Sequence, residues 1–235
     1  MRDLPRPSRG MSNISIKIHE AKLTERMVTV DTQYTKDVFR KLNYPLKRGN
    51  TILDVGCGDG SDGRFFETIY GLKWRGIDTH RNAAVKTAGS KFTTGSIFQI
   101  PFNDNTFDYV FTHDVIHHID EQHQRKQKHF AGLKELRRVC KRGGTIIIVE
   151  ANRYNPLFYP HMVKMLGHNH LRQSYFKKLI HDSYQTDLIQ FRFFEAHFYP
   201  PLLVQFFRIY EFIMEHIMPK EFIAYNAAII KKRNT

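Results

Sequence analysis

The stretch Thr51-Ile52-Leu53-Asp54-Val55-Gly56-Cys57-Gly58-Asp59-Gly60 decides the fold of this chain. Its first half is mostly apolar, which predicts a buried strand, and its second half has a glycine at every other position. Glycine reaches backbone angles that other residues avoid, and it lets a ligand approach the main chain. Residues 61–70 are predicted to be helical, so the stretch indicates a ligand-binding turn at the carboxyl end of a strand.

The glycine spacing is compatible with two classes of cofactor. The run from Gly58 to Gly63 satisfies the dinucleotide-binding pattern G-x-G-x-x-G, which is a weak signal by itself. Together with the preceding Asp54, however, the loop resembles the first motif of the class I S-adenosylmethionine-dependent methyltransferases that act on small molecules. The carboxylates of Asp54 and Asp59 would be unfavourable beside a pyrophosphate and tolerable beside the ammonium group of S-adenosylmethionine. The resemblance therefore favours a methyltransferase over a dehydrogenase.

A second stretch extends the resemblance to the ribose of the cofactor. The predicted strand Leu72–Ile77 ends in Asp78, 22 positions beyond Gly56. This spacing is close to the roughly 20-residue offset at which an acidic residue binds ribose hydroxyls. Asp78 or Thr79 could instead cap a helix N-terminus.

A third stretch, residues 95–110, resembles the family pattern of Gly-Asp, Leu-Pro-Phe, a polar turn and Phe-Asp before a strand. This chain has Ser96 where the family commonly has an aspartate that accepts from the adenine amino group. A serine oxygen accepts more weakly and has a shorter reach, so the backbone of Ile97 is expected to contribute to adenine binding. With the helix and strand that follow, the resemblance covers about residues 48–150.

Histidines follow the fourth predicted strand in the run His113-Asp114-Val115-Ile116-His117-His118. In the family this position lines the cleft where methyl donor and acceptor meet, which assigns His113 to the cofactor cleft. His117 is the candidate general base because imidazole titrates near neutral pH, with a structural role as the alternative. No metal site is predicted: the run differs from a zinc-protease helix, and His168-Asn169-His170 has no acidic or cysteine neighbour at ligand spacing.

The resemblance implies an α/β fold with a doubly wound, seven-stranded, mostly parallel sheet, helices on both faces and an added helical lid. Residues 1–12 are expected to form a disordered tail, and residues 13–235 a single methyltransferase domain. Its expected parts are an N-terminal helical cover (13–47), a cofactor-binding core (48–150), and acceptor lids or insertions (151–184 and 201–219).

Residues 202–218 are unusually apolar for one surface helix. Their polar side chains, Gln205, Arg208, Glu211 and Glu215, recur at helical spacing and predict one narrow polar stripe. The apolar remainder is expected to pack under the lid, against a second subunit or on a lipid surface.

Composition limits the cellular setting and the partners. The formal net charge of +13 is compatible with an anionic partner, but the basic residues are scattered and no RNA-binding signature accompanies them. Two cysteines give no disulfide framework, which favours a cytoplasmic location, and no apolar run has the length of a membrane span. The protein is expected to be a monomer or a homodimer.

The sequence therefore predicts methyl transfer from S-adenosylmethionine to a small-molecule or lipid-like acceptor, with release of S-adenosylhomocysteine. The loop residues expected to hold the methionine end are Asp54, Gly56, Cys57, Gly58 and Gly60. An RNA methyltransferase is the alternative, and an NAD-dependent oxidoreductase or a catalytically silent cofactor-binding module is less favoured.

Overall fold

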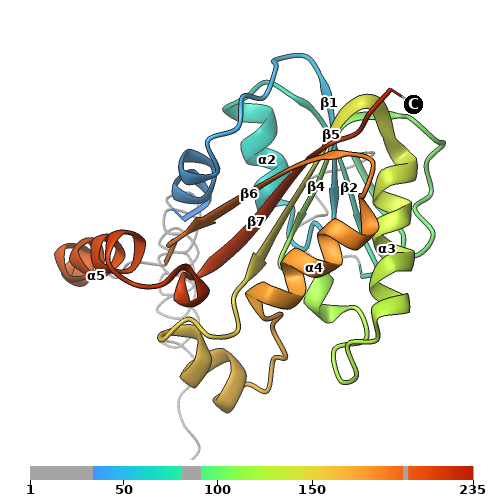
Figure 1. The fold of residues 1–235 in the computed structure, drawn as a ribbon. Helices are drawn as coiled ribbons and strands as arrows, with labels where there is room; N and C mark the ends of the chain where they lie inside the picture. The colour runs from blue at the N-terminus through green and yellow to red at the C-terminus, as the bar shows by residue number, and fades with distance from the viewer. Residues whose placement is uncertain (1–33, 81–90, 198–200, 235) are drawn as a thin grey trace, which may run out of the picture.

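The computed structural model describes residues 34–80, 91–197 and 201–234 (Figure 1). The expected tail and most of the expected N-terminal cover lie outside these residues. Residues 34–42, the last part of that cover, are helical.

A seven-stranded sheet forms the centre of the molecule. Its strands are β1 (Thr51–Val55), β2 (Lys73–Asp78), β3 (Phe92–Thr94), β4 (Phe107–His113), β5 (Cys140–Ala151), β6 (Leu188–Phe194) and β7 (Tyr225–Lys231). Their spatial order is β3-β2-β1-β4-β5-β7-β6, and only β7 runs antiparallel to its neighbours. The order reverses between β1 and β4, which places a crevice at their carboxyl ends. The predicted doubly wound sheet is confirmed.

Helices cover both faces of the sheet. Their bounds are α2 (Ser61–Thr68), α3 (Lys126–Val139), α4 (Gln173–Ser183) and α5 (Val204–His216), with short turns η2 (Ile116–His118), η3 (Tyr159–Met165), η4 (Pro201–Leu203) and η5 (Lys220–Phe222). Two buried clusters follow from this layering. One joins α3 and α4 to the sheet, and the other joins α2 and the helix at 34–42 to the opposite face.

The central strands are apolar along their whole length because both of their faces are buried. In β5, Ile146 and Ile148 pack in the cluster under α3 and α4, whereas Ile147 and Val149 pack in the opposite cluster. Alternate residues point to opposite faces of a strand, so the β-branched run contributes to both clusters.

The region expected to form a lid, residues 151–184, divides into two parts. Helix α4 is not a lid, because Phe176, Leu179 and Ile180 are fully buried in the main core and the helix packs beside α3. The segment before it, which contains η3, lies beyond the carboxyl end of β5 (Figure 1).

Helix α5 has an unexpected orientation at one margin of the molecule (Figure 1). Its acidic residues face inward, where Lys41 Nζ lies 2.8 Å from both Glu211 Oε2 and Glu215 Oε1. Apart from the buried Met214, many of its apolar side chains face outward, and Phe206, Ile209 and six residues in or beside α5 are exposed: Leu202, Leu203, Phe212, Ile213, Ile217 and Met218. Of the three expected partners for this surface, a covering lid is not present among the described residues, whereas a second subunit and a lipid surface stay predictions.

Trp74, the only tryptophan of the sequence, lies in β2 beneath the start of α2. A Cβ atom at Gly63 would lie 1.9 Å from Trp74 Cε2, so only glycine permits this contact. The ring also reaches the glycine loop, since a Cβ atom at Gly60 would lie 3.3 Å from Trp74 Cη2.

Candidate active site

The glycine loop leaves β1 in a tight turn that requires glycine. Gly56, Gly58 and Gly60 have φ angles of 76°, 51° and 77°, which L side chains rarely adopt. A Cβ atom at Gly56 would lie 2.4 Å from a methyl carbon of Val115, whereas one at Gly58 would meet nothing within 4 Å. The main chain at Gly58 is thus open to a ligand.

Asp78 lies beside this loop because β1 and β2 are parallel neighbours. Its Oδ2 accepts a hydrogen bond of 2.9 Å from the Gly58 amide, and its Oδ1 accepts one of 3.1 Å from the His80 amide. The predicted pairing of the glycine loop with the acid at the end of the second strand is present in the structure.

A cavity of about 510 Å³, here called the loop cavity, opens at these strand ends. The predicted residues that line it are Gly56, Asp78, Thr79, Ser96 and Ile97. Ser96 Oγ already accepts from the Phe98 amide at 3.2 Å, which limits what this oxygen can offer a ligand.

Cys57 does not line the loop cavity. It is buried against β2, where a Cβ atom at Gly76 would lie 2.8 Å from Cys57 Sγ. Burial raises the pKa of the Cys57 thiol, so this side chain packs as a neutral group.

Asp54 is a buried carboxylate with an orphaned oxygen. Only 2% of the residue is exposed, and Oδ2 has no hydrogen-bond partner among the described residues. Burial raises the pKa of Asp54 well above its ordinary value, and the neighbouring carboxylate of Asp62 raises it further. An isolated buried carboxylate is costly, so the site is suited to a ligand that brings a positive charge.

His113, at the end of β4, is held by partners from distant parts of the chain. Its Nδ1 donates to Asp62 Oδ2 at 2.9 Å, and its Nε2 lies 3.0 Å from Tyr34 Oη. Tyr34 Oη also lies 2.5 Å from Tyr225 Oη. Burial lowers the pKa of His113, but the negative charge and hydrogen bond of Asp62 outweigh it and raise the pKa to about 9.

A second cavity of about 490 Å³, here called the aromatic cavity, adjoins the loop cavity. Asp114 lines both cavities, and His113, Tyr34 and Tyr225 line the second. Its apolar lining residues are Ala151, Leu157, Phe158, Met162 and Ala196. Several come from the segment that follows β5.

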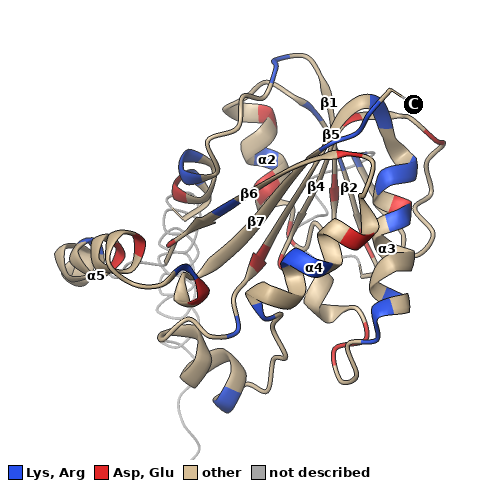
Figure 2. Cartoon of the chain, viewed as in Figure 1, with Lys and Arg blue, Asp and Glu red and all other residues tan. Residues whose placement is uncertain are grey.

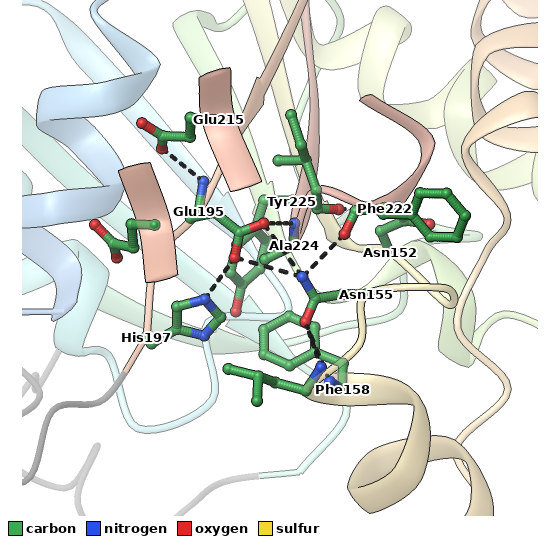
Figure 3. Close-up of polar contacts among 12 residues, drawn as sticks. Asn152, Asn155, Phe158, Glu195, His197, Glu215, Phe222, Ala224 and Tyr225 are labelled. Carbon is green, nitrogen blue, oxygen red and sulfur yellow. Dashed lines mark hydrogen bonds and ion pairs between the residues drawn. The ribbon is translucent and has the colours of Figure 1, made fainter. Parts of the chain in front are cut away.

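A buried polar cluster fixes one wall of the aromatic cavity (Figure 3). Glu195 accepts from His197 Nε2 at 2.6 Å, from the Ala224 amide at 2.8 Å and from Asn155 Nδ2 at 3.2 Å. Asn155 Oδ1 in turn accepts from the Phe158 amide at 3.2 Å. The cluster therefore joins the end of β6, the start of β7 and the segment after β5, and it positions two lining residues, His197 and Phe158.

His117, the candidate base, lies away from this chemistry. It is 2% exposed and is not a lining residue of the loop or aromatic cavity. Its Nδ1 lies 2.8 Å from Glu150 Oε2, and Glu150 also accepts from the amides of Val115 and Ile116. This network holds the turn after β4 in place, which favours the structural role for His117.

Comparison with known proteins identifies the family. Residues 53–148 match the family model described as a methyltransferase domain. Residues 53–148 thus form a methyltransferase domain of the class I S-adenosylmethionine-dependent type. It is 33% identical over 157 residues to an uncharacterized methyltransferase of Schizosaccharomyces pombe. The aligned part covers 60% of this chain and 53% of that relative, so the chain spans about half the length of the relative.

Two solved methyltransferases share the fold. One is an S-adenosylmethionine-dependent methyltransferase from Archaeoglobus fulgidus, with a TM-score of 0.63, 16% identity and coverage of 86% of this chain and 94% of that one. The other is phosphoethanolamine N-methyltransferase 2 from Haemonchus contortus in complex with S-adenosyl-L-methionine. Its TM-score is 0.58 at 20% identity, with coverage of 86% of this chain and 52% of that one.

Sequence reasoning missed several residues of the candidate site. In the sequence, Asp62 belongs only to the glycine-rich run, and Tyr225 lies far from it in β7. Tyr34 lies on the aromatic cavity. Only the fold brings these three side chains to His113.

Proposed function

We propose that this protein transfers a methyl group from S-adenosylmethionine to a small-molecule or lipid-like acceptor and releases S-adenosylhomocysteine. The observation that supports it is the pair of adjoining cavities that share Asp114, one beside the glycine loop and the other lined by apolar and aromatic side chains. Both cavities lie within the usual ~300–1,000 Å³ range of small-molecule sites.

Residues in and next to the loop cavity fit the parts of S-adenosylmethionine. Asp54 and Gly58 are not lining residues themselves but flank the lining residues Val55 and Gly56 in the chain. The buried, orphaned carboxylate of Asp54 would pair with the ammonium group, beside the open main chain of Gly58. Asp78 and Thr79 would contact the ribose, and Ser96 with Ile97 the adenine. Gly56 and Gly60 would shape the turn that admits the methionine end.

The reaction requires alignment more than acid–base chemistry. When bound, S-adenosylmethionine supplies a methyl group already activated by the positive charge on sulfur. The acceptor in the aromatic cavity would attack this methyl group with a lone pair, and the carbon–sulfur bond would break with its electron pair going to sulfur. The protein would contribute orientation and exclusion of water.

His113, rather than His117, is the histidine we assign to the acceptor side. It lines the aromatic cavity, and with a pKa of about 9 it is predominantly cationic near neutral pH. In that state it donates hydrogen bonds and does not accept a proton. We therefore propose that it orients the acceptor, or the Tyr34 hydroxyl beside it, and that proton loss from the acceptor needs no protein base.

Calorimetric titration with S-adenosylmethionine, S-adenosylhomocysteine and NAD tests the cofactor assignment. We expect the two adenosyl ligands to bind and Asp78→Ala to weaken both by about tenfold or more, the effect of losing ~1.4 kcal/mol of hydrogen bonding. Glu221→Ala, which removes an exposed acid on η5 that does not line the loop cavity, is the matched control. Tight NAD binding without a response to either adenosyl ligand would overturn the proposal.

A further inference from the structure

Four histidines from two chain segments meet beside the loop cavity. The ring centroid of His117 lies 4.0 Å from that of His118 and 4.3 Å from that of His170. The ring centroids of His118 and His168 lie 5.8 Å apart. One nitrogen of each of His117, His118 and His168 lies within 4.8 Å of the others. Sequence patterns do not predict this cluster, because about fifty positions separate the two segments.

Carboxylates hold one nitrogen of each of these three rings. His117 Nδ1 lies 2.8 Å from Glu150 Oε2, while the Nδ1 atoms of His118 and His168 lie 3.2 Å and 3.3 Å from the two oxygens of Glu121. The Nε2 atom of each ring is therefore the one left for a ligand. A carboxylate on the far nitrogen is the arrangement that orients histidine ligands and increases their basicity.

His170 provides a second, independent observation. It is 2% exposed, and neither of its ring nitrogens has a hydrogen-bond partner among the described residues. A buried polar group without a partner is costly, and here two nitrogens of one ring are in that position. One of them lies within 4.8 Å of a ligand atom of His117.

We propose that His117, His118 and His168 bind a divalent transition metal ion of the class that prefers imidazole, such as Zn²⁺ or Co²⁺, with His170 as a fourth ligand. Three nitrogens around a tetrahedral Zn²⁺ lie about 3.3 Å apart, which requires the rings to close from their present separations. The side chains of His118 and His168 are 50% and 38% exposed and can move, whereas His117 is fixed by Glu150.

The surroundings provide both support and access for such an ion. Glu121 also accepts from the Asn169 amide at 3.1 Å, which ties the histidine segment to the turn after β4. A hollow of about 890 Å³, lined by His118, Glu121 and His168 among others, leads to the cluster from solvent. His118 also lines the loop cavity, so a bound metal would fix one edge of that cavity. This role does not depend on the proposed methyl transfer.

Metal titration of the untagged, chelator-treated full-length protein tests the proposal. We expect one Co²⁺ per chain, with visible absorption bands of tetrahedral nitrogen coordination, and a matching stoichiometry for Zn²⁺ by calorimetry. His118→Gln and His168→Gln change partly exposed side chains and should fold, and each should weaken binding at least tenfold. Glu121→Gln should weaken it 10- to 100-fold, as expected for a residue that supports the ligands.

His123→Gln is the matched control, because this histidine is 66% exposed, lies in the adjacent turn and is outside the cluster. It should leave the affinity unchanged. Absence of stoichiometric Co²⁺ and Zn²⁺ binding to the wild-type protein would overturn the proposal. Equal binding by the wild-type, His118→Gln and His168→Gln proteins would do the same, as would a loss in His123→Gln as large as theirs.

Discussion

At the scale of single residues, the buried carboxylate of Asp54 destabilises the ligand-free protein. Burial and Asp62 raise the pKa of Asp54, so the folded state holds its proton more tightly than the unfolded state does. Stability therefore decreases as pH rises above the ordinary carboxyl range of about 4. A bound cationic ligand would offset this loss of stability.

We accordingly expect Asp54→Asn to raise the unfolding free energy of the ligand-free protein at about pH 8. The same change should weaken S-adenosylmethionine binding, because the ammonium group loses its counter-ion. Chemical unfolding and calorimetry on one preparation would measure both effects. A variant that binds normally would remove Asp54 from the site.

The His113–Asp62 pair predicts a loss of stability at alkaline pH. The pKa of His113 is about 9 in the folded protein, against about 6.5 for an unperturbed histidine. Its contribution is fully present below about pH 6.5 and is lost as pH rises through about 9. We expect urea unfolding to show a decrease of about 1–3 kcal/mol across this window.

His113→Gln should remove that decrease, whereas His181→Gln, at an exposed position of α4, should retain it. An unchanged pH profile in His113→Gln would assign the alkaline loss to other groups.

The residues that the sequence predicted best are those next to one another at strand ends. Gly56 and Asp78 were placed correctly because neighbouring parallel strands end side by side. Tyr34, Asp62 and Tyr225 converge on His113 from segments 51 to 112 positions away, and local patterns carry no information about such contacts.

At the scale of elements, α5 shows where periodicity was informative and where it was not. The predicted polar stripe exists, but Glu211 and Glu215 face Lys41 instead of solvent. Helical spacing identifies which residues share a face, and it does not identify which face packs inward. A partly buried lysine with two carboxylates and the Glu195 carbonyl as acceptors decides the orientation here.

Glu195 should be important for the wall of the aromatic cavity. Glu195→Gln removes the charge that its three donors bind, and we expect a loss of about 1–3 kcal/mol of unfolding free energy. The affinity for S-adenosylmethionine should stay within a factor of about 2, since ~0.4 kcal/mol is the scale of indirect effects at separate sites. Glu221→Gln, an exposed change on η5, is the control for stability. A parallel loss of cofactor binding would show that the two cavities are coupled.

At the scale of the whole molecule, the family resemblance was sufficient to predict a doubly wound, seven-stranded, mostly parallel sheet with helices on both faces. The proposal of an acceptor lid was less accurate, because composition cannot distinguish a helix that covers a ligand from one that covers the sheet. No helix in residues 34–80, 91–197 and 201–234 is both long and apolar enough to cross a membrane.

Charge at this scale bears on the RNA alternative. Figure 2 shows Lys and Arg spread over many elements, with acidic side chains among them. We expect single-stranded RNA to bind weakly and to lose less than about tenfold in affinity between ~50 and ~200 mM salt, since few phosphates can be contacted at once. Fluorescence anisotropy with labelled RNA would measure this dependence. A much steeper loss would reveal a concentrated binding surface and favour an RNA acceptor.

The packing of Trp74 beneath the loop has a practical consequence. Because the sequence has a single tryptophan, and its ring touches the first turn of α2 and reaches the glycine loop, tryptophan emission, excited selectively at long wavelength, comes from one point beneath the loop. Ligand binding and local melting of the loop can therefore be followed in real time without attaching a dye. Trp74 is therefore an intrinsic fluorescence probe of the glycine loop.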